Sequence, residues 1–186
     1  MIWTFGILLA STSAAAPTHQ CGVDTALSLK LSFDQFDQDM EGGWRAVASR
    51  GKNCLLPAAN LIAAYRAKHP RNRSLLNWHE GQLRATAGDY RAAIPLMKAS
   101  RHAPTLGGFQ DGWNPYVDAT IAFLRGDRQK LLKASAELKA TPRPPADAYP
   151  PDQPWPFNVD VAQGLINCFG KPYAVAYQTK CRSMPK

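Results

Sequence analysis

His79-Glu80 is the pair of neighbouring residues in this sequence best suited to chemistry, because it could begin a zinc-protease signature. Such a site needs a second histidine three residues after the glutamate, so that both imidazoles lie on one helical face. That position holds Leu83, and His69 and His102 fall where loops are expected. The sequence therefore predicts no metal at this point, and His79 is interpreted as a side chain near the surface of a helix pair.

The acidic stretch from Asp37 to Gly42 is a second candidate, because its spacing resembles the start of a calcium-binding loop. The bidentate acid that such a loop needs at its twelfth place is Ala48, and Trp44 already begins a helical pattern. Acidic residues are favoured at a helix N-terminus by the helix dipole. We therefore interpret this stretch as the approach to a helix and expect no calcium.

Nucleophile and phosphate-binding motifs are missing from the sequence. No serine has the G-x-S-x-G setting, and neither Gly42-Gly43 nor Gly107-Gly108 belongs to a phosphate-cradling loop. We therefore expect no enzyme and no cofactor.

Four cysteines, none in a C-x-x-C pair, are typical of an exported protein with two disulfides. Three pairings are possible. Cys168 and Cys181 flank a short turn between two helical patterns, so a bridge between them would fasten adjacent helices. That pairing is favoured, and Cys21 with Cys54 follows by elimination.

The first residues also indicate export. An apolar run from Ile2 to Ala10 is followed by small and polar residues, which is the shape of a secretory signal peptide. No basic residue precedes that run, and a buried N-terminal helix is the alternative interpretation. No later stretch is long enough to span a membrane.

The net charge of +8 favours anionic partners, but the basic residues are spread along the chain. We expect no specific nucleic acid, a periplasmic or secreted location, and a monomer.

The spacing of apolar residues predicts helices throughout, with no sustained alternation that would indicate strands. Trp44, Trp78 and Trp113 lie 34 and 35 residues apart, and Pro70 and Pro104 are 34 apart. Between each tryptophan and the next proline come two helical patterns separated by a break. The chain is therefore expected to be all-α and built of antiparallel helix pairs.

The middle unit resembles the tetratricopeptide repeat in its Gly81, Gly88-Asp89-Tyr90, Ala93-Ile94 and Pro104. The resemblance covers about residues 40–142. It implies a right-handed superhelix of about three repeats, closed by a C-terminal capping helix pair. The expected organisation is a signal peptide at 1–16, an N-terminal segment at 17–39, repeats at 40–142, a proline-rich connector at 143–157 and capping helices at 158–186.

The same resemblance implies a concave groove that holds a peptide or protein partner. The corresponding positions are Val47, Arg50, Trp78, Gln82, Ala85, Trp113, Tyr116 and Thr120. The alternative is that the tryptophans only pack between repeats.

Two functions follow from different classes of protein. The first is an exported, non-enzymatic module that binds a peptide or protein in the groove. The second is a hydrolase or accessory factor acting on an acidic cell-envelope polymer, which would use His79 with Glu80. A hydrogen-bonded His79–Glu80 pair in a closed pocket would favour the second.

Overall fold

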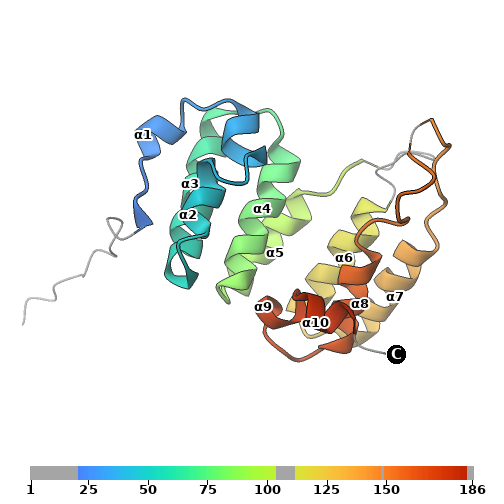
Figure 1. Cartoon of the computed structure of the whole chain (residues 1–186). Coiled ribbons are helices and arrows are strands. Elements are labelled where there is room, and N and C mark those ends of the chain that lie inside the picture. The colour runs from blue at the N-terminus through green and yellow to red at the C-terminus, as the bar shows by residue number, and fades with distance from the viewer. Residues whose placement is uncertain (1–20, 104–111, 148, 184–186) are drawn as a thin grey trace, which may run out of the picture.

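The structure is a computed structural model, and it describes residues 21–103, 112–147 and 149–183. Every regular element in these ranges is a helix, so the expected all-helical fold is confirmed there (Figure 1). The longer helices are α3 (Leu55–Lys68), α4 (Arg73–Thr86), α5 (Tyr90–Ala99), α6 (Trp113–Leu124), α7 (Arg128–Lys139) and α8 (Val159–Asn167). The shorter elements are α1 (Thr25–Ser28), η2 (Asp34–Gln38), α2 (Gly43–Ala48), η3 (Lys52–Cys54), α9 (Tyr173–Ala176) and α10 (Thr179–Arg182).

Two helix pairs, α4–α5 and α6–α7, are joined by turns of the same construction. Gly88 and Gly126 have φ values of 87° and 68°, a left-handed conformation that ends a helix at little cost for glycine. The following Asp89 and Asp127 then cap the second helix, because their carboxylates accept hydrogen bonds from Ala92 N and Lys130 N at 3.2 and 3.0 Å. Each Gly-Asp pair is therefore a local signal that ends one helix and begins the next.

These turns also correct the repeat length expected from the tryptophans. Gly88 and Gly126 are 38 positions apart, whereas Trp78 and Trp113 are separated by 35. As a result Trp78 lies in the sixth position of α4, and Trp113 is the first residue of α6. The tryptophan spacing does not mark equivalent positions in the two helix pairs.

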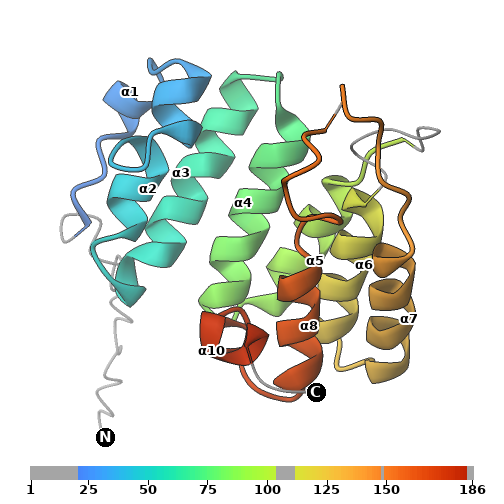
Figure 2. The same cartoon turned by 45° about the vertical axis from the view of Figure 1, so that its right-hand side comes forward.

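Helix α4 is central because it contributes to both parts of the core. Leu76 and Leu83, seven residues apart, belong to the apolar cluster formed with α2 and α3. Trp78 and Ala85 belong to the cluster formed with α5 to α9. A helix that is apolar on two sides is buried between its neighbours. The position of α4 between α3 and α5 is visible in Figure 2.

Gly81 is a point of close approach between α4 and α5. A Cβ atom at this position would lie 2.9 Å from Met97 Cγ and 3.3 Å from the carbonyl oxygen of Ala93. Ala93 itself is fully buried. Small residues therefore meet at this crossing and set how closely the two helices pack.

After helix α8, the C-terminal part is more broken than the expected capping helix pair. It forms two single-turn helices, α9 and α10, with a break at Tyr177 and Gln178. Cys168, at the end of α8, is bonded to Cys181 of α10, which is the pairing that the sequence favours. This segment also folds back on the middle of the chain, since Tyr173 N donates to Tyr90 Oη at 2.9 Å.

The connector before α8 has no helix in its described residues, as its prolines predict. Trp155 anchors it to the body, because its Nε1 donates to the carbonyl oxygen of Thr141 at 3.0 Å. At the other end of the chain, the Cys21–Cys54 bond ties the N-terminal segment to the start of α3. None of the described helices is long and apolar enough to cross a membrane. The expected signal peptide, 1–16, lies outside the described residues.

Candidate functional site

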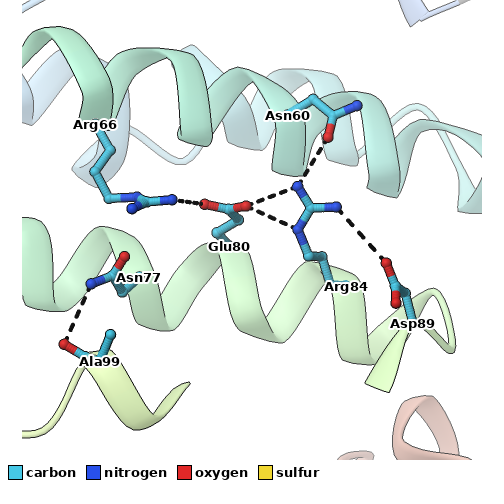
Figure 3. Close-up of polar contacts among 7 residues, drawn as sticks. All are labelled: Asn60, Arg66, Asn77, Glu80, Arg84, Asp89 and Ala99. Carbon is cyan, nitrogen blue, oxygen red and sulfur yellow. Dashed lines mark hydrogen bonds and ion pairs between the residues drawn. The ribbon is translucent and has the colours of Figure 1, made fainter. Parts of the chain in front are cut away.

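Glu80 is one of two buried carboxylates among the described residues, and it is fully engaged with arginines (Figure 3). One of its oxygens accepts from Arg66 of α3 at 2.6 Å, and the other is bonded to Arg84, one turn further along α4, at 2.8 and 2.9 Å. Arg84 also donates to the Asn60 side chain at 3.0 Å. This cluster fastens α3 to α4 and leaves the Glu80 carboxylate no free oxygen for a substrate.

His79 is bonded to Asp37, not to Glu80. Its Nδ1 lies 2.7 Å from the Asp37 carboxylate, which also accepts from Trp44 Nε1 at 2.8 Å. Arg45 donates to the backbone carbonyl of Asp37 at 2.7 Å. Asp37 has no exposed surface. His79 therefore fastens α4 to η2 and α2, on a different side of the helix from Glu80.

The charge state of Asp37 follows from these contacts. Burial by itself would raise the pKa of its carboxyl group, but the hydrogen bonds from His79 and Trp44 and the positive charges of His79 and Arg45 outweigh it. The net result is a pKa below the ordinary value for aspartate. Because an ionised carboxylate only accepts hydrogen bonds, Nδ1 of His79 must carry the hydrogen.

This geometry removes the His79–Glu80 pair on which the hydrolase hypothesis was based. Adjacent residues on a helix point about 100° apart, and here they contact different neighbours. Leu83, at the position of the missing zinc ligand, lies in the apolar core. Within the described residues, no three His, Cys, Asp or Glu side chains gather closely enough to hold a metal ion.

The acidic stretch before α2 is explained differently from the sequence-based expectation. Helix α2 begins at Gly43, so Asp37 lies on the preceding π-helix and not in the first turn of α2. Asp39 Oδ1 accepts from Glu41 N at 2.9 Å. Asp37 is held by side-chain partners from α2 and α4, which the helix-dipole argument could not foresee.

The three spaced tryptophans all pack between helix pairs. Trp44 lies 5.4 Å from the His79 ring, and Trp78 lies 5.0 Å from both Trp113 and Tyr116, measured between ring centroids. Nε1 of Trp113 donates to the carbonyl of Ser100 at 2.8 Å. All three indole rings therefore contact aromatic residues of neighbouring helices.

The predicted groove positions do not form an open surface. Five of them are buried: Val47, Trp78, Ala85, Tyr116 and Thr120. Among the remaining three, Trp113 is bonded to Ser100 and Arg50 donates to the carbonyl of Cys21. The last, Gln82, donates to Tyr177 Oη at 3.0 Å.

The C-terminal segment lies against two of these positions, Gln82 and Tyr116. Tyr177, which follows α9, accepts from Gln82 of α4 and lies near Tyr116 of α6. Burial, first of all, raises the pKa of Tyr116 well above the ordinary value, with the nearby Tyr173 and Tyr177 adding to the effect, so its phenol remains neutral. The segment predicted as a cap therefore contacts Gln82 and Tyr116, two of the residues predicted to line a groove.

A furrow remains open beside the covered region, at the C-terminal end of α4. Two adjoining hollows of about 490 and 460 Å³ share Thr86 and Ala174 in their walls. The first is bordered by the start of α3 and the second by α9 and α10. Figure 2 shows α10 next to the end of α4, and Figure 1 shows α9 there. No local sequence pattern indicates this furrow, because α9 and α3 meet there only through tertiary folding.

The walls of the furrow combine apolar and basic side chains. Leu55, Leu56 and Ala87 supply apolar surface on one side, and Leu56 is 40% exposed. Lys52 lies at one end and Lys180 at the other, and no aspartate or glutamate lines either hollow. Such a surface can accept apolar side chains and carboxylates together. In comparisons with family models, curated proteins and solved structures, no match to this chain was found.

Proposed function

We propose that this chain is an exported, non-enzymatic interaction module that binds an acidic peptide segment of a partner protein in the furrow. The observation that carries the proposal is that the furrow combines apolar surface from Leu55, Leu56 and Ala87 with two lysines, Lys52 and Lys180. Neither Lys52 nor Lys180 forms an ion pair with a described residue, so both charges are available to a ligand. An extended peptide would place an apolar side chain on Leu56 and its carboxylates near the two lysines.

Two further features support parts of this proposal. Disulfides persist in oxidising compartments, so the Cys21–Cys54 and Cys168–Cys181 bonds favour a periplasmic or secreted location. The shared Gly-Asp turns of α4–α5 and α6–α7 favour a tetratricopeptide-like, right-handed stack of helix pairs. In this proposal the C-terminal segment narrows the usual concave groove to the furrow.

The function can be tested with synthetic peptides and fluorescence anisotropy. We expect the protein to bind a labelled peptide of alternating Glu and Leu, and to bind peptides of alternating Lys and Leu or Glu and Ser at least about tenfold more weakly. The Leu56→Asp substitution should lower the affinity for the Glu-Leu peptide by about tenfold or more, because it removes apolar contact and adds a charge that repels the peptide's carboxylates.

Leu132→Asp is the matched control for that variant. Leu132 on α7 is 45% exposed, close to the exposure of Leu56, and it does not line the furrow. Its replacement should leave peptide affinity unchanged. Equal weakening by both variants, or no binding of the Glu-Leu peptide, would refute the furrow as the binding site. Envelope proteins captured by the wild type and by Leu132→Asp, but not by Leu56→Asp, would be the natural partners.

A further inference from the structure

Three aromatic rings are stacked next to the loop between α3 and α4. The Phe36 and Tyr65 rings lie 3.7 Å apart and 5° from parallel, and the Tyr65 and His69 rings lie 4.1 Å apart and 18° from parallel. Phe36 has no exposed surface and Tyr65 only 2%, whereas His69 is partly exposed. A further ring could therefore join this stack only at its His69 end.

A pocket of about 440 Å³ lies at that end of the stack. Leu31, Phe33, Tyr65 and His69 contribute to its walls, together with Arg71. Two polar atoms beside the pocket are already used, because Tyr65 Oη donates to the carbonyl of Leu31 at 2.9 Å and His69 Nε2 is bonded to the carbonyl of Leu29 at 3.0 Å. The pocket thus offers ring faces and aliphatic surface, and its volume suits a small molecule.

The mouth of this pocket is basic. Arg71 lines it, and Lys68 and Arg73 flank the same loop as the last residue of α3 and the first of α4. The side chains of these three residues are exposed and form no hydrogen bond or ion pair with another described residue. No acid lines the pocket; Asp34 follows Phe33 in sequence but is not part of its wall. Guanidinium groups bind carboxylates and phosphates well, and the local charge would attract them.

We propose that this pocket binds a small molecule made of a planar aromatic ring and an anionic group. The ring would extend the stack of Phe36, Tyr65 and His69, and the anion would lie at Arg71. This site is separate from the furrow, since the two have no lining residue in common. The inference does not depend on the proposed peptide-binding function.

The test is a titration of the whole protein followed by amide chemical shifts in NMR. The probes are 2-naphthoate and 2-naphthyl phosphate, which share the ring and differ in the source of the anion. We expect either or both to shift the amides of Leu31, Phe33 and His69 in a saturable way. The uncharged 2-naphthamide and the non-planar decahydro-2-naphthoate should each bind about tenfold more weakly, because one lacks the anion and the other the flat ring.

Two charge reversals separate a specific site from general attraction by a basic protein. Arg71→Glu should weaken binding by about tenfold. Arg91→Glu, at an exposed position of α5 that does not line the pocket, should leave it unchanged. The proposal is overturned by equal effects of the two variants, by equal binding of the decahydro compound, or by the absence of shifts around the pocket. Both substituted residues are exposed, so the variants are expected to fold.

Discussion

Asp37 and Glu80 are the two buried carboxylates of the described chain, and both hold α4 against its neighbours. The Asp37 carboxylate accepts a hydrogen bond from His79 of α4, and Glu80, which accepts from Arg66, is the next residue along that helix. Because adjacent helical side chains diverge, one contact reaches η2 and α2 while the other reaches α3. The pair that looked catalytic in the sequence is thus two separate structural contacts, and both define the orientation of α4.

The Asp37 carboxylate should make stability depend on acid. Its pKa is lowered in the folded state, so its contribution is fully present above the unfolded value of about 4 and is lost as pH falls through the folded pKa. Asp37→Asn keeps the shape but removes the charge that pairs with His79. We expect it to cost roughly 1–3 kcal/mol of unfolding free energy near neutral pH. The difference from the wild type should shrink below about pH 4.

Urea unfolding at a series of pH values measures this difference. Asp152→Asn, an exposed aspartate on the connector, is the control and should be within about 0.5 kcal/mol of the wild type throughout. A cost for Asp37→Asn that is constant with pH would contradict an ion-pair role. The same contacts revise the expectation that His79 lies at the surface. His79 is bonded to the buried Asp37 carboxylate, so its replacement should lower the unfolding free energy more than replacement of a surface residue would.

At the scale of helices, the α4–α5 crossing depends on small residues. Ala93→Leu would place a larger side chain where α4 and α5 are already close at Gly81. We expect it to lower the unfolding free energy by about 1–3 kcal/mol through overpacking. Ala99→Leu, an exposed position at the end of the same helix, should change it by less than about 0.5 kcal/mol.

Thermal melts with and without a strong chelator provide the comparison for both leucine variants. If Ala99→Leu lowers the melting temperature as much as Ala93→Leu, the effect of leucine on the helix itself, and not the crossing, controls stability. A wild type that melts at a lower temperature in the chelator would point to a bound metal, which we do not expect.

The sequence predicted elements well where their signals are local. Gly88-Asp89 and Gly126-Asp127 each carry a helix stop and a helix start within two residues, so no other part of the chain is needed to recognise them. The Asp37–His79 bond joins residues 42 positions apart, and no local pattern specifies it. The capping helices could not be bounded in the same way, because the chain breaks at Tyr177, whose carbonyl oxygen accepts from Arg182 at 2.7 Å.

For the molecule as a whole, the fold-back of the C-terminal segment matters most. Gln82 and Tyr177 are 95 positions apart, so a repeat pattern that describes only neighbouring helices could not reveal their contact. The furrow and the pocket beside His69 likewise join distant segments and could not be located from the sequence.

The Cys168–Cys181 bond should hold this fold-back in place. Helices α9 and α10 have four residues each, too few to persist without tertiary contacts. Replacing both cysteines by serine should lower the unfolding free energy by about 3 kcal/mol. We also expect faster amide hydrogen exchange in α9 and α10, and increased exchange of the Tyr116 region that they cover.

Replacing Cys21 and Cys54 by serine is the matched control. It should accelerate exchange around α1 and the start of α3 and leave α9 and α10 protected. Unchanged protection of α9 and α10 after loss of Cys168–Cys181 would mean that packing alone keeps the segment in place.

The order of the two disulfides along the chain has a consequence for how they can form. Each joins consecutive cysteines, first with second and third with fourth, and the loops neither overlap nor enclose each other. A chain that enters an oxidising compartment with its N-terminus first therefore presents each cysteine's correct partner as the next thiol to arrive. An oxidase that simply joins thiols in order of appearance would produce the native set, and no isomerase would be needed to reshuffle it.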